Sequence, residues 1–323
     1  MSSNIDIKIN TLEGGEEKVY LVDFFKRMTS KSNIPVLIYL VLNVFVIGAI
    51  MNMLFGGNFA VCLLGGIVLY AISLVIALSP FGEFILRLQT GCKKIKRVEQ
   101  INYIEPIFRE VYDKAKKLDP SIPDDVQLFM NSDEDPNAFA TGRKTICITE
   151  GMLKMPVDQI KATLGHEFGH LAHKDTDLIL VVSIGNLIVS AFILGIRLFI
   201  DLIHILFSLV TMFLGGPEGA IAAICNALYH AMISAIVFGL TWLWTKIGVL
   251  LVMKSSRSNE FEADEFSFNL GYGNELCILL DSISGSHAKG LFANLASSHP
   301  DKDDRIAKLQ ELGATYRATY GAK

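Results

Sequence analysis

Two pairs of long apolar runs alternate with two polar stretches along the chain. The first pair, Ile34 to Phe55 and Phe59 to Leu78, contains no charged residue. Each run is long enough to cross a hydrocarbon core of about 30 Å as a helix. The second apolar region, Leu178 to Met253, is interrupted by a Gly-Gly-Pro-Glu turn signal at 215–218. The pattern predicts an integral membrane protein with two transmembrane helical hairpins.

The charges beside these runs predict sidedness. No Lys or Arg lies between the first two runs, whereas basic residues flank the pair at 26–31 and 87–97. The positive-inside rule then places both ends of the hairpin in the cytoplasm. The acidic start of the chain lacks the pattern of a secretory signal. We predict a cytoplasmic segment at 1–31, hairpins at 32–86 and 178–253, and one cytoplasmic domain divided between 87–177 and 254–323.

The second hairpin differs from an ordinary pair of spans. Its arms have about 35 residues each, roughly 50 Å as helix, and they contain charged residues. Arg197 and Asp201 are four apart and could pair on one helix face. We interpret these charges as lying near an interface or outside the lipid. Trp242, Trp244 and Lys246 resemble an interfacial belt.

The polar stretches predict a mostly α, α+β domain. Apolar residues recur at three- and four-residue steps from Ile101 to Leu118, which indicates an amphipathic helix. Short apolar runs at 126–130 and 144–149 indicate strands of a small sheet. Pro156 suits the first turn of another helix, which continues through Leu171.

Composition narrows the class of protein. The chain of 323 residues is 51% hydrophobic and 19% charged, with a mean hydropathy of +0.41. Soluble chains carry about 25% charge, so the low charged fraction argues against an ordinary cytosolic enzyme. The net charge of −4 gives no reason to expect nucleic acid as a partner. Five cysteines without a CxxC pair argue against a disulfide framework or a thiolate zinc site.

The predicted helix after Pro156 carries the sequence His166-Glu167-Phe168-Gly169-His170. Histidines four apart share one helix face, so both imidazoles can reach one metal ion. Glu167 follows the first histidine and can act as general base toward a water on that metal. A catalytic zinc needs three protein ligands, so one remains to be found.

The third ligand stays open on spacing alone. His173 would lie a turn beyond the metal, so a distal carboxylate is favoured. The segment after the second hairpin offers four acids, of which Glu260 and Asp264 share a helix face. We interpret Asp175 and Asp177 as a polar boundary before the membrane run.

Taken in order along the chain, these motifs resemble the HtpX family of membrane zinc metalloproteases, with the CAAX prenyl endopeptidases as more distant relatives. The resemblance covers essentially the whole chain and includes three further stretches. They are Asn137-Ala138-Phe139-Ala140-Thr141-Gly142, Ser256-Arg257 followed by Glu260-Phe261-Glu262-Ala263-Asp264, and Ser298-His299-Pro300 with Arg305-Ile306.

This resemblance implies a definite site with one Zn²⁺ per chain. His166, His170 and Glu260 would hold the zinc, Glu167 would be the catalytic base, and His299 would donate to the oxyanion. Asp264, Arg257 and Arg305 would orient or support the ligands. An edge strand made of Asn137, Ala138, Phe139 and Ala140 would bind an extended polypeptide by β-augmentation, although Asn137 and Gly142 could simply form a turn.

The implied function is a gluzincin-like endopeptidase of the bacterial inner membrane, with its protease domain in the cytoplasm. Its partners would be polypeptide substrates, membrane or misfolded proteins among them, and the lipid bilayer; the role would be quality control under stress. Two alternatives stay open. One is a membrane sensor or scaffold that keeps the zinc site without general proteolysis. The other is a CAAX-type endopeptidase, against which the small number of predicted spans argues.

Overall fold

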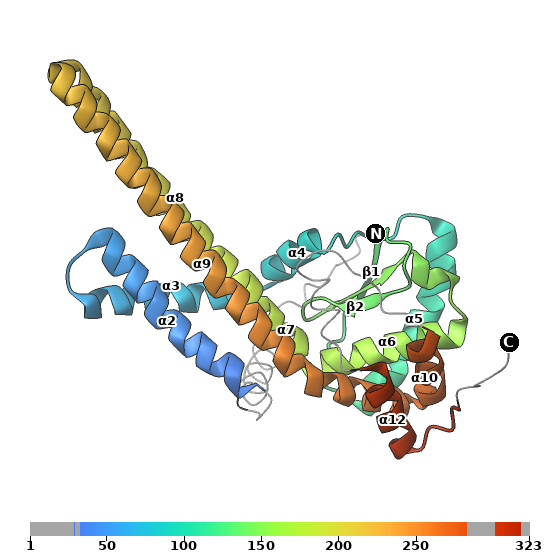
Figure 1. Cartoon of the computed structure of the whole chain (residues 1–323). Helices are drawn as coiled ribbons and strands as arrows, with labels where there is room; N and C mark the ends of the chain where they lie inside the picture. The colour runs from blue at the N-terminus through green and yellow to red at the C-terminus, as the bar shows by residue number, and fades with distance from the viewer. Residues whose placement is uncertain (1–28, 30–32, 283–300, 318–323) are drawn as a thin grey trace, which may run out of the picture.

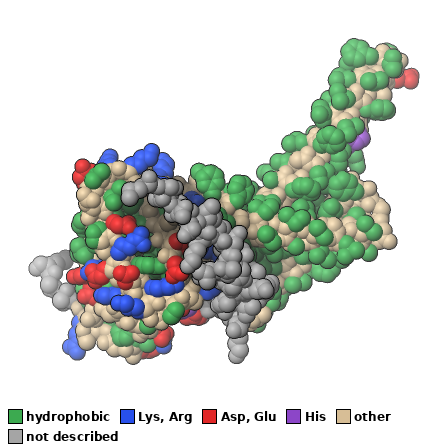
Figure 2. All heavy atoms as spheres, turned by 180° about the vertical axis from the view of Figure 1, so that it is seen from behind, with side chains coloured by type: hydrophobic (Ala, Val, Ile, Leu, Met, Phe, Trp, Pro, Cys, Tyr) green, Lys and Arg blue, Asp and Glu red, His purple; other side chains and the backbone are tan. Residues whose placement is uncertain are grey.

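The computed structural model describes residues 29, 33–282 and 301–317, apart from the side chains of 249–258. It is mostly helical, with one three-stranded sheet, as predicted. Two helical hairpins lie on one side of a domain that contains the sheet (Figure 1). Lys, Arg, Asp and Glu side chains gather on the domain, whereas hydrophobic side chains cover the hairpins (Figure 2).

The first hairpin consists of α2 (Ile34–Phe55) and α3 (Phe59–Ala77). Gly56 and Gly57 adopt positive φ values of 68° and 91° in the turn, a conformation that glycine reaches without steric cost. The Asn58 side chain then accepts the Ala60 N–H and caps α3. A short helix, α4 (Pro80–Gln89), follows two residues after α3.

The second hairpin is much longer than the first (Figure 1). Its first arm joins α7 (Asp175–Ile179), the π-helical stretch η2 (Leu180–Gly185) and α8 (Asn186–Leu214) into 40 continuous residues. At 1.5 Å per residue this arm is about 60 Å long, twice the hydrocarbon core. The second arm belongs to α9, which runs for 52 residues from Gly216 to Ser267. Both boundaries that we predicted for this hairpin, at 177/178 and 253/254, fall inside helices.

Four helices in the described part of the chain are long and apolar enough to cross a membrane. They begin at Ile34, Phe59, Asp175 and Gly216. Their exposed surfaces carry large apolar side chains, of which Phe213 and Leu214 at the tip of the second hairpin are 79% and 83% exposed. The chain is therefore a membrane protein.

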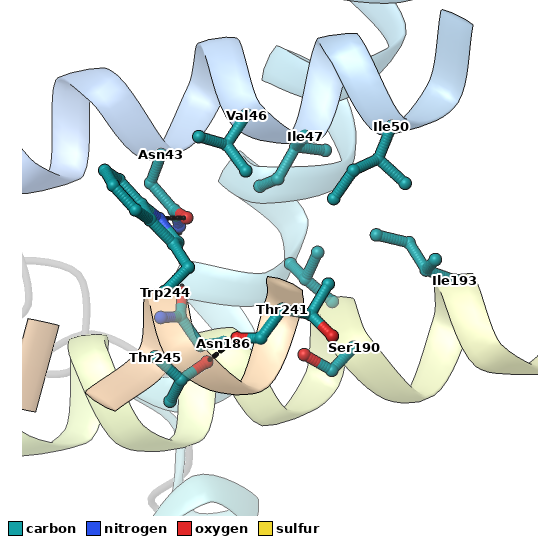
Figure 3. A pocket seen from close by; sticks show the side chains of 11 residues that line it. Asn43, Val46, Ile47, Ile50, Asn186, Ser190, Ile193, Thr241, Trp244 and Thr245 are labelled. Atoms are coloured by element: carbon teal, nitrogen blue, oxygen red, sulfur yellow. Dashed lines mark hydrogen bonds between the residues drawn. The ribbon is translucent and has the colours of Figure 1, made fainter. Parts of the chain in front are cut away.

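Buried polar side chains connect α2 to the second hairpin (Figure 3). Asn43 donates to Asn186 at 2.8 Å and accepts the indole N–H of Trp244 at 2.7 Å. The Tyr39 and Trp244 rings stack with their centroids 5.0 Å apart. The Trp244 indole therefore faces α2. A buried polar group in lipid needs a partner, and this network supplies one from each helix.

A second polar cluster joins α8 to α9 farther along the hairpin. Arg197 lies 3.1 Å from Asp201, which confirms the predicted pairing, and it donates to Ser234 at 2.9 Å. The rings of His204 and His230 lie against each other at 3.8 Å. Arg197 and Asp201 on α8 both bond to Ser234 on α9, so these charged side chains connect the two arms of the hairpin.

The domain contains the predicted helices and strands. In the sheet, β3 lies between β1, with which it is parallel, and β2, with which it is antiparallel. The elements are α5 (Val98–Leu118), β1 (Gln127–Asn131), β2 (Ala138–Ala140), β3 (Thr145–Thr149), η1 (Gly151–Lys154), α6 (Val157–Ala172), η3 (Phe268–Tyr272), α10 (Gly273–Ser282) and α12 (Lys302–Leu312). In the stretch from Asn137 to Gly142, the three residues Ala138–Ala140 form the edge strand β2.

The domain core holds α6 in a fixed position. Phe168 on α6 packs against Phe108 and Tyr112 of α5, with ring centroids 5.5 and 5.7 Å apart. The last turns of α9 cross the opposite side of α6, where Gly169 meets Ala263. The helix that carries the HExxH motif is therefore buried between α5 and α9.

Gly169 is expected to be intolerant of even one methyl group. A Cβ on Gly169 would lie 2.8 Å from the Ala263 Cα and 3.0 Å from the Phe266 Cβ, so α6 and α9 would have to separate. We expect Gly169→Ala to destabilise the domain by about 1–3 kcal/mol, as overpacking usually does. Thermal unfolding in detergent measures this. Gly239→Ala, at a position on α9 with no heavy atom within 4 Å of the new Cβ, is the control, and an equal loss in both variants would contradict the packing argument.

Candidate metal centre

Three side chains converge where α6 and α9 cross. His166 and His170 lie one turn apart on α6, and their Nε2 atoms are 3.2 Å apart. Glu260 reaches them from α9, with its two oxygens 3.4 Å from the Nε2 of His166 and 3.4 Å from that of His170. Among the described residues, these three form the one group of His, Cys, Asp or Glu that could hold a metal ion.

The spacing of this triad fits zinc. A tetrahedral ion with bonds of about 2.0–2.1 Å separates its ligand atoms by about 3.4 Å. The two Nε2 atoms, 3.2 Å apart, agree with that edge length, and each lies 3.4 Å from one of the two oxygens of Glu260, so one ion can reach both imidazoles and the carboxylate. Two imidazoles and one carboxylate are also a donor set that catalytic zinc uses. The residues present therefore fit the ion that the motif predicts.

An ion-pair network holds the first histidine and the carboxylate. Asp264, one turn after Glu260, accepts from the Nδ1 of His166 at 2.8 Å and so leaves its Nε2 to face the triad. The Arg305 guanidinium on α12 donates to both oxygens of Asp264 at 2.6 and 2.7 Å and lies 3.5 Å from Glu260. Burial alone would raise the pKa of Asp264, but Arg305 and His166 outweigh it and hold that pKa below its ordinary value.

The second histidine is held by a carboxylate that the sequence analysis misinterpreted. Asp175 accepts from the Nδ1 of His170 at 3.0 Å and from the amide of Asn259 at 2.8 Å. It is 8% exposed. Our prediction of a mere polar boundary is therefore wrong for Asp175: both histidines have a carboxylate behind them, the arrangement that fixes the tautomer of a metal ligand.

The path of the chain after α6 explains the error. Lys174 adopts the left-handed conformation, with φ 58° and ψ 31°, and turns the chain so that α7 starts beside the end of α6. Gly or Asn would have signalled such a turn, whereas Lys does not. Without that signal, a residue five positions after His170 is expected to lie beyond the site.

We expect loss of the Asp175 carboxylate to weaken metal binding. Asp175→Ala should lower zinc affinity by about 10–100-fold, the usual effect of removing a group that orients a ligand. Competition with a zinc-binding dye measures the change. Asp158→Ala, at an exposed acid on the first turn of α6, should leave the affinity unchanged. A similar loss there, or none at Asp175, would remove Asp175 from the site.

The buried acids also make metal binding depend on pH. Burial opposes the charged imidazolium, yet Asp264 and Glu260 raise the pKa of His166, and Asp175 and Glu260 raise that of His170 well above its ordinary value. Zinc must displace any proton on the imidazoles, so its apparent affinity should rise with pH and fall on acidification through that raised range. Calorimetric titrations in two buffers of different ionisation enthalpy should report proton release; a pH-independent affinity would contradict this.

Glu167 points to the sheet rather than into the ligand network. Its Oε2 accepts the backbone N–H of Ala140 at 2.6 Å. Ala140 belongs to β2, which pairs with β3 on one side and forms the edge of the sheet. The carboxylate beside the triad is thus in contact with the strand that we predicted as the substrate platform. Asn137 lies directly before this strand, and its N–H bonds to Thr149.

The remaining predicted residues are placed as follows. His299 lies outside the described residues, as does the side chain of Arg257, although its backbone belongs to α9. His173 is not part of the triad; its Nδ1 lies 4.0 Å from Glu262. His204 and His230 face each other within the second hairpin.

Comparison with known proteins identifies the family of this chain. The model of Peptidase family M48 matches residues 100–313. A Protease HtpX homolog of Burkholderia lata is 27% identical over 252 residues, which cover 67% of this chain and 77% of that relative. Homologues of the same name from Burkholderia cenocepacia and Burkholderia multivorans match to the same extent.

The apolar helices, the assembled triad and these matches together define the class: a membrane metalloprotease. The chain belongs to peptidase family M48, and its similarity to Protease HtpX homologues confirms the resemblance that the motifs gave.

Proposed function

We propose that this chain is a zinc-dependent endopeptidase that hydrolyses peptide bonds of membrane or misfolded proteins at the cytoplasmic face of the bacterial inner membrane. The observation that supports this most strongly is the convergence of Glu260, 90 positions after His170 in the sequence, on the two motif histidines. A structural helix with two histidines would not require that carboxylate.

The residues divide the chemistry among themselves. His166, His170 and Glu260 would hold the zinc, which when bound polarises the scissile carbonyl and lowers the pKa of water. Glu167 takes the proton of the attacking water and delivers it to the leaving amine. Asp264 and Asp175 keep the imidazoles oriented from behind. His299 donates to the oxyanion, as the resemblance implies.

Substrate would bind along β2 as an additional strand. The strand is short and lies at the sheet edge, and the Ala140 N–H, in contact with Glu167, points away from β3. Binding through main-chain hydrogen bonds makes recognition depend on an extended, accessible chain more than on one side chain. This suits polypeptides that are misfolded or loosened near the membrane.

The membrane topology is part of the proposal. Two hairpins, with basic residues at both ends of the first, keep the domain on the cytoplasmic side. The long second hairpin would extend past the far side of the bilayer, because its arms exceed the hydrocarbon thickness.

Cleavage of casein and of a prenylated peptide by the detergent-solubilised full chain tests the function. We expect casein to be cut at several sites and the activity to disappear with a zinc chelator. Cleavage restricted to a prenylated peptide would favour the CAAX-type alternative instead. Zinc binding without cleavage of either substrate would favour a sensor or scaffold.

A further inference from the structure

The helix α4 exposes an apolar stripe at the point where the chain leaves the membrane. Phe81, Phe84 and Leu88 are 58%, 48% and 65% exposed, and their spacing places them on one helix face. Gly82, Glu83 and Leu86 form the buried opposite face. Because α3 ends only two residues before α4 begins, this stripe lies at the boundary of the hydrocarbon core, as in helices that rest in the interface.

A run of exposed cations follows α4 along the chain. Lys93, Lys94, Lys96 and Arg97 are exposed, and none forms an ion pair with a residue in the described ranges. Elsewhere on the domain, by contrast, Lys116, Lys144 and Lys161 each lie 2.7 to 2.9 Å from a carboxylate.

Hydrogen bonds attach the start of the segment Lys93–Arg97 to the sheet. Lys93 forms two backbone hydrogen bonds with Met130 of β1, at 2.8 and 2.9 Å, and the side chain of Asn131 donates to the Thr90 carbonyl at 2.8 Å. The four cations are therefore presented from a segment attached to the sheet.

The helix α4 is also hydrogen-bonded to the turn between β2 and β3. Glu83 accepts the backbone N–H of Arg143 at 2.8 Å, and the Arg143 guanidinium donates to the Leu78 carbonyl, at the end of α3, at 3.0 Å. Gly142 adopts φ +85°, and a Cβ there would lie 2.6 Å from the Cγ of Glu83. Only Thr141 separates Gly142 from Ala140, whose N–H contacts Glu167.

We propose that the exposed face of α4 and the segment Lys93–Arg97 form a docking surface for anionic lipid headgroups, and that docking holds the β2–β3 turn, and with it the edge strand, at the bilayer surface. Three observations carry the choice of occupant: α4 follows a membrane-spanning helix after two residues, its apolar stripe is exposed, and the cations have no ion-pair partner among the described residues. Basic side chains near an anionic leaflet are each attracted to it, and the attraction adds over the run.

Lipid affinity tests the docking surface without any need for activity. The full chain in detergent is titrated with phosphatidylglycerol or phosphatidylcholine, and the bound lipid is counted by native mass spectrometry. We expect tighter, saturable binding of phosphatidylglycerol. Replacing Lys93, Lys94, Lys96 and Arg97 together by Gln should weaken it about tenfold or more and leave phosphatidylcholine binding unchanged.

The control removes four other exposed cations, by changing Arg109, Lys117, Lys154 and Lys308 to Gln. Equal affinity for the two lipids, or an equal loss in the control variant, would overturn the proposal. Displacement of phosphatidylglycerol by inorganic phosphate at similar concentration would show a free-anion site instead and would overturn it too.

Hydrogen exchange tests the connection to the edge strand. In lipid nanodiscs, amides of residues 138–145 should exchange more slowly when phosphatidylglycerol is included than in phosphatidylcholine alone, and the variant lacking the four cations should lose this difference. Phe84→Ser, which keeps every cation, should reduce it as well. Exchange that is independent of lipid charge would contradict the coupling, whatever the proteolytic activity proves to be.

Discussion

Replacing Glu167 by Gln is expected to lower kcat/KM for casein by about 10³-fold while zinc stays bound. Loss of a positioned general base typically costs about 10²–10⁴ in rate. The amide has nearly the shape of the carboxylate and can still accept the Ala140 N–H through its oxygen, but it cannot take the proton from water. Initial rates and metal content, measured on the same preparation, check both halves of the prediction.

Glu265→Gln is the matched control, since Glu265 is an exposed acid on α9 with no contact to the triad. It should retain full activity. If Glu167→Gln cleaved casein at the wild-type rate, the assignment of the base would be wrong. If Glu167→Gln lost its zinc, the effect would be structural instead.

Replacing Arg305 by Met is expected to be the most destabilising change near the site. The Arg305 guanidinium is buried and bonded to both oxygens of Asp264, which is itself 1% exposed. Removing one partner of such a pair leaves the other charge uncompensated and costs about 3–5 kcal/mol. Asp264 would then hold His166 less firmly, so zinc affinity should fall too. Thermal unfolding in detergent and zinc titration measure the two effects.

Lys308→Met on the same helix is the control for this prediction. Lys308 is exposed and pairs with Glu311 at the surface, so its loss should leave zinc affinity unchanged. If Arg305→Met were as stable as the wild type and bound zinc equally well, the network behind His166 would contribute nothing to the site.

Much of the fold follows from local pattern. The uncharged runs predict α2 and α3 by length alone. The regular apolar spacing from Ile101 to Leu118 predicts α5 to its last residue and misses only its first three. The HExxH motif predicts two ligands because both lie one turn apart on one helix. These inferences need no knowledge of what packs against each element.

The choice of the third ligand depended on resemblance, because four acids within six residues are equivalent by spacing. The structure distinguishes them by the way α9 crosses α6. Glu260 and Asp264 lie on the face turned to the motif, with 3% and 1% exposure, whereas Glu265 is exposed to solvent. The two helices cross closely because Gly169 has no side chain. This contact joins two segments that are far apart in the sequence, and the local pattern of neither segment predicts it.

The continuity of α9 was equally hidden from local pattern. The composition changes from apolar to charged near residue 253, which suggested a boundary between membrane and domain. A single helix nevertheless passes through it, because no Gly or Pro interrupts 249–267. The helix α9 therefore extends without a break from the second hairpin to Glu260, so the hairpin helps to position this ligand.

The most direct test of the account is the metal content of the purified chain. The triad predicts one zinc per chain in the wild type, and a large loss in Glu260→Gln under the same dialysis, with Glu262→Gln unchanged. Elemental analysis of the three proteins decides between the outcomes. A wild-type chain without metal, or a Glu260→Gln variant that retains it fully, would contradict the metal centre on which the proposed protease rests.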